Sequence, residues 1–224
     1  MLAKAGRHRS AGEVPSGPVR HSGSAQRSME RTEVLIVGAG PTGLVLALWL
    51  TRLGIRIRII DRTEGPGTTS RALGIQARTL ELYRRLDLAD AVVGAGHRVP
   101  AINVWTAGTR RARIPFAADP RDPTPYPFLL IYPQDAHERL LIEHLAAAGI
   151  HVERRTELVG FTQEGTRVVA TLRTGEGAQE RVAAAYLAGC DGARSTVRET
   201  LGIGFPGGTY DRFFYVADIA ADGP

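Results

Sequence analysis

The chain has 224 residues, of which 43% are hydrophobic and 23% are charged, a composition typical of a globular protein with one or two domains. Its formal net charge is +5, but residues 1–28 hold five basic residues against Glu13, a net of +4. The rest of the chain is nearly neutral, which argues against a basic groove for nucleic acid.

The cysteine, histidine and lysine content excludes several kinds of site. Cys190 is the one cysteine, so we expect no intramolecular disulfide, no cysteine-ligated metal and a reducing compartment, the cytoplasm. His137 and His144 are seven residues apart, and no histidines show the H-x-x-x-H spacing of metal sites. Lys4 is the one lysine, which excludes a catalytic lysine from the rest of the chain. We therefore predict no metal site.

Residues 1–30 are rich in Ser, Gly, Pro and Arg and have no hydrophobic period, which predicts a disordered tail. Because this tail precedes a clear folding pattern, we expect translation to start at Met29. The segment 34–51 then has 18 residues without a charge, the length of a membrane span. A Gly-Ala-Gly-Pro-Thr-Gly interruption at residues 38–43 argues for a strand, a turn and a helix instead, so we predict no membrane association.

The segment 32–61 is the one around which the chain is organised. A compact apolar run at 34–37 predicts a buried parallel strand, the run 44–52 predicts a helix, and a second apolar run at 55–60 ends in Asp61. Gly38, Gly40 and Gly43 between strand and helix have the spacing G-x-G-x-x-G. This βαβ pattern is the fingerprint of dinucleotide binding.

Each residue of the fingerprint has a physical role. Gly38 allows the tight turn after the strand, Gly40 leaves room for a pyrophosphate, and Gly43 lets the helix pack closely. The N–H groups at the start of the helix attract the phosphate charge. Asp61, 18 positions after Gly43, is placed to accept hydrogen bonds from the adenosine ribose. This segment leaves open which dinucleotide is bound.

Further elements follow in chain order. Loops are predicted where Gly and Pro gather, strands where β-branched residues alternate or cluster, and helices where apolar residues recur with helical spacing. The expected elements are a loop at 62–70, a helix ending near 88, two short strands within 98–116, a loop at 117–127, a strand at 128–132, a helix at 135–148, strands at 150–153, 157–163, 167–173 and 180–187, and a strand pair beyond 205.

The chain contains three motifs that occur in combination: Gly38-Ala-Gly-Pro-Thr-Gly43, Arg71-Ala-Leu-Gly-Ile-Gln-Ala-Arg78 and Asp191-Gly-Ala-Arg-Ser-Thr-Val-Arg198. Over about residues 32–220 the chain resembles the group A flavoprotein monooxygenases, which share the p-hydroxybenzoate hydroxylase fold. It is most similar to the phenol hydroxylase and aromatic-polyketide hydroxylase branch. The third motif is the specific part of the resemblance.

The resemblance implies an α/β fold: a Rossmann-like, glutathione-reductase-type FAD-binding domain with a central parallel sheet, plus an incomplete β-rich portion of a substrate domain. We expect the FAD-binding domain at 31–97 and 124–204, and the partial substrate-binding domain at 98–123 and 205–224. Family members carry a second, later G-D motif at the FAD ribityl chain, and no G-D follows position 192 here. We therefore expect the chain to correspond to the N-terminal portion of a hydroxylase.

The resemblance also implies a set of cofactor-binding residues. In the family's arrangement the first motif surrounds the ADP half of FAD, an acid holds the ribose, an arginine lies near the pyrophosphate and flavin, a glutamine contacts FAD, and the D-G turn meets the cofactor. The corresponding residues are Gly38, Ala39, Gly40, Pro41, Thr42, Gly43, Asp61, Arg62, Arg71, Gln134 and Asp191. Arg194 and Arg198 would hold the D-G turn.

Plainer interpretations of three residues stay open. Arg71 is also consistent with a solvated loop charge, Gln134 with an ordinary helix start, and Asp191-Gly192 with a type I′ turn.

The function implied is FAD-dependent hydroxylation of a small aromatic substrate, with NADPH or NADH as the reductant and O₂ as the oxidant. The cofactor supplies the chemistry, so no catalytic residue is named. Two alternatives remain: an inactive nucleotide-binding remnant, and an FAD-dependent reductase of the same fold. A simple NAD-dependent dehydrogenase leaves the motif at Asp191 unexplained. The sequence predicts no oligomeric state.

Overall fold

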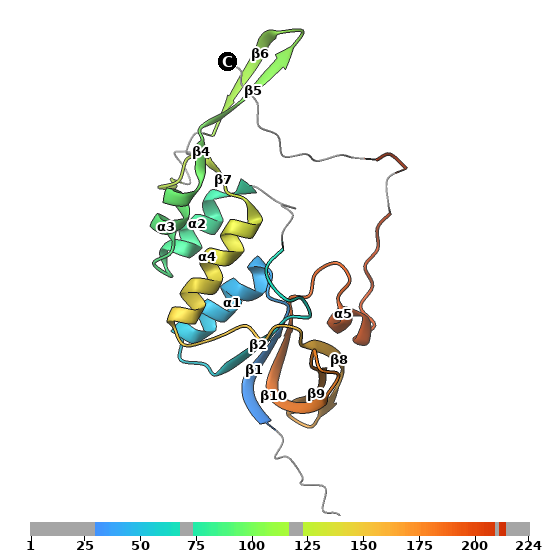
Figure 1. The fold of residues 1–224 in the computed structure, drawn as a ribbon. Helices are drawn as coiled ribbons and strands as arrows, with labels where there is room; N and C mark the ends of the chain where they lie inside the picture. The colour runs from blue at the N-terminus through green and yellow to red at the C-terminus, as the bar shows by residue number, and fades with distance from the viewer. Residues whose placement is uncertain (1–29, 68–73, 117–122, 209–210, 214–224) are drawn as a thin grey trace, which may run out of the picture.

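The computed structural model of the chain describes residues 30–67, 74–116, 123–208 and 211–213. The expected tail up to residue 29, Arg71 and most of the strand pair predicted beyond residue 205 lie outside these ranges. The described part has a mixed α/β architecture in which helices pack on a central sheet (Figure 1).

The central sheet has five strands in the order β2-β1-β10-β9-β8. Strands β2, β1 and β10 run parallel to one another, and β9 and β8 each pair antiparallel with the preceding strand in this order. The prediction of an α/β fold built on parallel strands is confirmed, and the sheet is mixed because β8, β9 and β10 are joined by short turns. The strands are β1 (Glu30–Val37), β2 (Ile57–Ile60), β8 (Glu157–Glu164), β9 (Arg167–Arg173) and β10 (Gln179–Gly189).

Strand β1 lies at the centre of the fold and is buried on both faces. Val34 and Ile36 pack into one hydrophobic cluster, together with residues of α1 (Pro41–Arg52) and α4 (Gln134–Ala147). Leu35 and Val37 point to the other face and pack with residues of β8, β9, β10 and α5 (Thr196–Thr200). A run of four consecutive apolar residues is therefore explained by two cores, one on each side of the strand.

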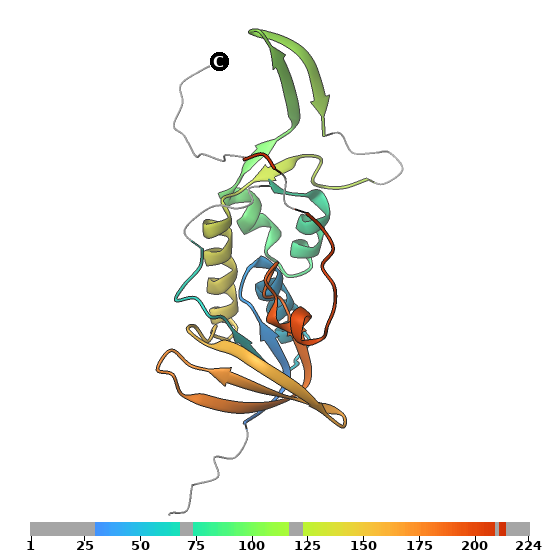
Figure 2. The same ribbon diagram turned by 90° about the vertical axis from the view of Figure 1, so that its right-hand side faces the viewer.

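Helices α1 and α4 lie side by side on one face of the sheet, and α5 lies beyond the other face (Figures 1 and 2). The helix predicted at 135–148 is confirmed as α4. Two more helices, α2 (Ala77–Arg84) and α3 (Ala89–Ala95), extend the cluster formed by α1 and α4. Sequence reasoning missed α3, which is short and whose N-cap residue, Leu88, makes no side-chain capping hydrogen bond.

Two smaller sheets complete the described part. The first has the order β3-β7-β4, with β3 (Gly74–Ile75), β4 (His97–Val99) and β7 (Leu129–Ile131). The second is a hairpin of β5 (Ala101–Thr106) and β6 (Thr109–Pro115), which projects away from the central sheet (Figures 1 and 2).

The strand predicted at 150–153 is wrong. The chain pairs with the edge of β2 at one position, where the N–H of Glu153 donates to the carbonyl of Ile59 and the N–H of Asp61 donates to the carbonyl of Glu153. Arg155 then takes a left-handed backbone conformation with φ of 52°. This conformation ends the extended run before a strand is established.

A buried polar contact joins α2 to α4. The hydroxyl of Tyr83 lies 2.9 Å from Nε2 of His137, and the ring of Tyr132 lies against the same imidazole. Burial raises the pKa of Tyr83 and lowers the pKa of His137 to about 4. His137 is therefore a neutral core residue at physiological pH.

Candidate functional site

The carboxyl ends of three adjacent parallel strands form the floor of the site. Gly38 follows β1, Asp61 follows β2, and Cys190 follows β10. The N–H of Gly38 donates to the carbonyl of Ile60 at 2.9 Å, and the N–H of Cys190 donates to the carbonyl of Val37 at 2.7 Å. In open α/β sheets this edge is where ligands bind.

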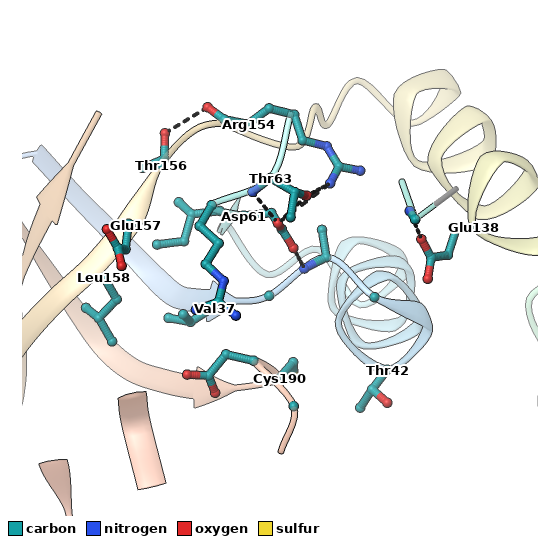
Figure 3. Close-up of a pocket in the computed structure, with 18 of the residues that line it drawn as sticks. Val37, Thr42, Asp61, Thr63, Glu138, Arg154, Thr156, Glu157, Leu158 and Cys190 are labelled. Atoms are coloured by element: carbon teal, nitrogen blue, oxygen red, sulfur yellow. Dashed lines mark hydrogen bonds and ion pairs between the residues drawn. The ribbon is translucent and has the colours of Figure 1, made fainter. Parts of the chain in front are cut away.

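A pocket of about 390 Å³ opens at this edge (Figure 3). It brings together nine of the eleven residues predicted to bind the cofactor: Gly38, Ala39, Gly40, Pro41, Thr42, Asp61, Arg62, Gln134 and Asp191. Gly43 lies beneath the pocket in the first turn of α1, and Arg71 lies outside the described residues. Gly38 and Asp191, which are 153 positions apart in the sequence, thus line one pocket.

Gly38 and Gly43 are required by the packing of the protein itself. Gly38 has φ of 102°, and a Cβ there would lie 2.3 Å from the carbonyl oxygen of Cys190. A Cβ on Gly43 would lie 1.9 Å from the carbonyl oxygen of Gly38. Any larger residue at either position would force the turn, the helix and β10 apart.

Gly40 is different, because nothing in the described part of the chain requires a glycine there. Its φ of −75° suits any residue, and a Cβ would have no atom of the described residues within 4 Å. The space that a side chain would fill belongs to the pocket. Gly40 caps α1 without a side-chain hydrogen bond, and Pro41 follows it, so the first N–H groups of the helix remain available for a ligand.

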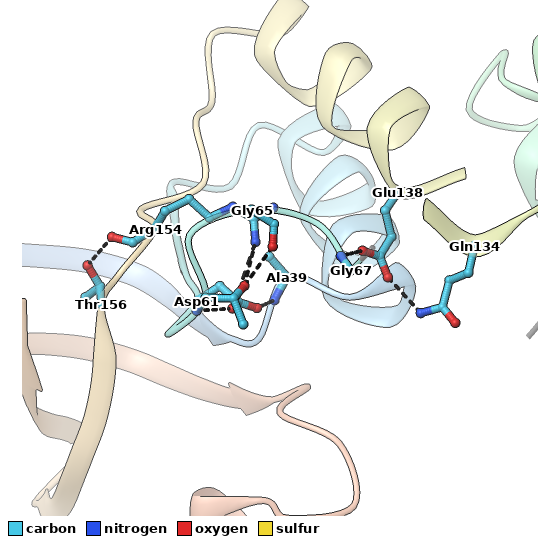
Figure 4. Close-up of polar contacts among 9 residues, drawn as sticks. Ala39, Asp61, Gly65, Gly67, Gln134, Glu138, Arg154 and Thr156 are labelled. Atoms are coloured by element: carbon cyan, nitrogen blue, oxygen red, sulfur yellow. Dashed lines mark hydrogen bonds and ion pairs between the residues drawn. The ribbon is translucent and has the colours of Figure 1, made fainter. Parts of the chain in front are cut away.

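Asp61 holds the glycine-rich loop in place. One carboxylate oxygen, Oδ2, accepts a hydrogen bond of 2.7 Å from the N–H of Ala39 (Figure 4). The other oxygen, Oδ1, accepts bonds from the N–H and the hydroxyl of Thr63, at 2.8 and 2.6 Å. A carboxylate offers about four acceptor positions. One position on Oδ2 therefore remains for a ligand.

Sequence reasoning missed Arg154, which covers the Asp61 end of the pocket (Figure 4). Its Nη1 lies 3.3 Å from the hydroxyl of Thr63 and 3.9 Å from Oδ1 of Asp61. Its Nη2 is buried and has no hydrogen-bond acceptor in the described part of the chain. Thr156, which is buried beside it, donates to the carbonyl of Arg154 at 3.1 Å.

Gln134 and Glu138 form the opposite end of the pocket. Gln134 is the first residue of α4, and its Nε2 donates to Oε1 of Glu138 at 2.7 Å. The second oxygen of Glu138 accepts a bond of 3.2 Å from the N–H of Gly67 (Figure 4). Sequence reasoning missed Glu138 as well, although its position four residues after Gln134 places both side chains on one helix face.

The carboxylate of Asp191 is turned toward α5. It accepts hydrogen bonds from the hydroxyl of Ser195 at 2.6 Å and from the N–H of Val197 at 3.3 Å. The guanidinium of Arg198 donates to the carbonyl of Ala193 at 2.7 Å, so this arginine holds the turn as expected. Arg194 lines the pocket instead, with no hydrogen bond or ion pair of its side chain to another described residue.

The described residues offer neither a metal site nor a membrane-spanning helix. No group of three or more His, Cys, Asp and Glu side chains within them could hold a metal ion. Cys190 lines the pocket, where burial and the neighbouring Asp191 raise the pKa of its thiol. None of the helices in the described ranges is both long enough and apolar enough to cross a bilayer.

Known proteins share this chain's sequence and fold. A family model described as an FAD binding domain matches residues 31–224. The 6-methylpretetramide 4-monooxygenase of Streptomyces rimosus is 44% identical over 190 residues, which cover 85% of this chain and 34% of that protein. The chain spans about a third of the length of the curated relatives it matches.

Two crystal structures extend the similarity to the fold. The p-nitrophenol 4-monooxygenase PnpA from Pseudomonas putida DLL-E4 matches with a TM-score of 0.76 and 28% identity, over 81% of this chain and 46% of that one. The flavin-dependent monooxygenase PieE, in complex with FAD and substrate, matches with a TM-score of 0.70 and 32% identity, over 80% and 33%. The chain therefore belongs to the FAD binding domain family that is found in the group A flavoprotein monooxygenases.

Proposed function

We propose that this chain provides the ADP-binding part of the FAD site in a flavin-dependent monooxygenase that hydroxylates a small aromatic substrate, with NADPH or NADH as reductant and O₂ as oxidant. The observation that carries the proposal is the space over Gly40. The protein leaves this position open at the N-terminus of α1, at the edge of the sheet where dinucleotides bind.

The residues of the pocket fit FAD at both ends. The uncapped N–H groups of α1 suit a pyrophosphate, whose oxygens accept hydrogen bonds and carry negative charge. Asp61 retains an acceptor position for a ribose hydroxyl. The buried Nη2 of Arg154 lacks an acceptor in the described structure, and an adenosine has several acceptor atoms. These three features are complementary to the groups of an ADP moiety.

The side chains of this site would bind and orient the cofactor. FAD, when bound, supplies the redox chemistry of hydroxylation. Asp61 would hold the ribose, Arg62 and Arg154 lie beside it, and Gln134 lies at the far end of the pocket. We extend the proposal to Arg71 near the pyrophosphate and to Asp191, which would act through the turn that it stabilises.

The substrate class follows from the relatives. Their names describe monooxygenases of pentachlorophenol, rifampicin and 6-methylpretetramide. We propose a small aromatic substrate for this chain, without nucleic acid or membrane partners, in the cytoplasm. In the same proposal residues 31–97 and 124–204 form the FAD-binding domain, and 98–123 and 205–224 belong to a substrate-binding domain that includes the projecting β5–β6 hairpin.

A titration of the purified chain with FAD tests the proposal. We expect saturable quenching of flavin fluorescence, competition by ADP and no competition by FMN, because FMN lacks the ADP half. A folded chain that binds neither FAD nor ADP would overturn the proposal and favour the inactive remnant. FAD binding that FMN displaces and ADP does not would also overturn it.

Two glycine variants sharpen the test. Gly40→Val places a branched side chain in the path of the pyrophosphate, so it should abolish FAD binding and change the free energy of unfolding by no more than about 1 kcal/mol. Gly43→Ala drives a Cβ into the carbonyl of Gly38 and should destabilise the fold by about 3 kcal/mol or more. A Gly40→Val variant that still binds FAD would contradict the assignment of the pocket.

A further inference from the structure

Glu138 is a buried carboxylate in the wall of the pocket, with 5% of its surface exposed. A buried carboxylate needs hydrogen-bond donors, because each of its oxygens has lost its water. Here one donor is Nε2 of Gln134, at 2.7 Å, and another is the N–H of Gly67, at 3.2 Å. Glu138 therefore connects the start of α4 to the loop that follows β2.

The first of these contacts fixes the orientation of the Gln134 amide. A glutamine amide has a donating end and an accepting end, and its environment decides which end points where. An ionised carboxylate only accepts, so Glu138 selects the orientation in which Nε2 of Gln134 faces it. The carbonyl oxygen Oε1 of Gln134 then points away from Glu138 (Figure 4).

We propose that Glu138 is a positioning residue that makes Gln134 present its carbonyl oxygen to the cofactor. The inference rests on the proposed function, since it assigns the polarity of one contact in the FAD site. Pyrophosphate oxygens accept hydrogen bonds only and are met by the N–H groups of α1. An accepting Gln134 is suited to a hydroxyl-bearing part of FAD.

A double-mutant cycle on FAD affinity tests this coupling. Gln134→Ala removes the acceptor, and Glu138→Gln keeps the shape of the side chain while adding an N–H₂ group that no longer selects one orientation. We expect each single variant to weaken FAD binding by about tenfold and the double variant to bind like Gln134→Ala. Additive losses would overturn the inference, because Glu138 would then act independently of Gln134.

Glu143→Gln is the matched control, since it makes the same chemical change at an exposed position of the same helix. It should leave FAD affinity unchanged. Glu138→Gln and Glu143→Gln should unfold at urea concentrations close to that of the wild type, whereas Gln134→Ala should unfold at a lower one, because it removes a donor from the buried Glu138. A Glu138→Gln variant that loses FAD only because it unfolds would contradict the positioning role.

The side-chain amide of Gln134 provides a readout that needs no cofactor. Its NMR resonances, identified by their loss in Gln134→Ala, should show slowed solvent exchange in the wild type and fast exchange in Glu138→Gln. Fast exchange in the wild type would overturn the inference even if FAD binds. Slow exchange together with a wild-type chain that fails to bind FAD would leave the contact intact and refute the proposed function alone.

Discussion

Replacement of Asp61 by alanine should produce two separate losses, one in stability and one in FAD affinity. In the structure the carboxylate accepts hydrogen bonds from the N–H of Ala39 and from the N–H and hydroxyl of Thr63. Ala39 is 2% exposed, so its N–H would lose its partner without gaining water. Thr63 is exposed, and water can replace its lost partner.

The magnitude of each loss follows from these contacts. A buried N–H without an acceptor costs about 1–3 kcal/mol, which is the expected decrease in the free energy of unfolding of the cofactor-free protein. A charged acceptor for a ribose hydroxyl contributes about 1.5–3 kcal/mol, so FAD binding should weaken by roughly 10- to 150-fold.

Urea unfolding of the cofactor-free protein and a fluorescence titration with FAD measure the two quantities. Glu64→Ala is the matched control in the same loop, because Glu64 has 77% of its side chain exposed and forms a surface ion pair with Arg155. Such pairs contribute little, so both quantities should stay near those of the wild type. An unchanged unfolding free energy in Asp61→Ala would refute its role in bracing the loop, and an unchanged FAD affinity would remove Asp61 from the ribose contact.

Two further predictions concern buried groups. Burial lowers the pKa of His137 to about 4, whereas an exposed histidine titrates near about 6.5. The unfolded chain therefore takes up the proton first as the pH falls, and the free energy of unfolding should decrease between about pH 6.5 and 4, by about 3 kcal/mol in total. His137→Gln keeps an acceptor for Tyr83 and should flatten this pH dependence, measured by urea titrations at several pH values. If the unfolding free energies of the variant and the wild type fall in parallel with pH, His137 is not the group responsible. Arg154→Met removes a buried donor that has no acceptor in the described structure, so it should weaken FAD binding several-fold and shift the unfolding free energy by less than about 1 kcal/mol; wild-type affinity in a titration would exclude Arg154 from the site.

Local sequence patterns determined the elements around the site. The apolar run of β1, the spacing of Gly38, Gly40 and Gly43, and the acid at the end of β2 define a βαβ unit from its periodicity and turn chemistry alone. The match to the FAD binding domain family and the similarity to a solved structure confirm the family assignment and the α/β fold that these patterns indicated. The missed helix α3 and the wrong strand at 150–153 are short segments, for which periodicity gives little information.

The tertiary structure decided which side chains meet. Arg154 reaches Thr63 from a segment 91 positions away, and no local pattern contains that contact. The structure also showed that the carboxylate of Asp191 accepts hydrogen bonds from Ser195 and Val197. It further showed that packing requires glycine at Gly38 and Gly43, whereas a Cβ at Gly40 would meet no atom of the described residues within 4 Å.

The physical reason for this division is the range of the interactions. Backbone conformation and hydrophobic periodicity depend on neighbouring residues, so the sequence alone determines the strand, the glycine-rich turn and the helix at the centre of this protein. The direction of a buried donor or acceptor depends on which distant segment packs against it. The contacts of Glu138 with Gly67, of Asp61 with Ala39 and of Arg154 with Thr63 therefore follow only from the way distant segments come together at one edge of the sheet.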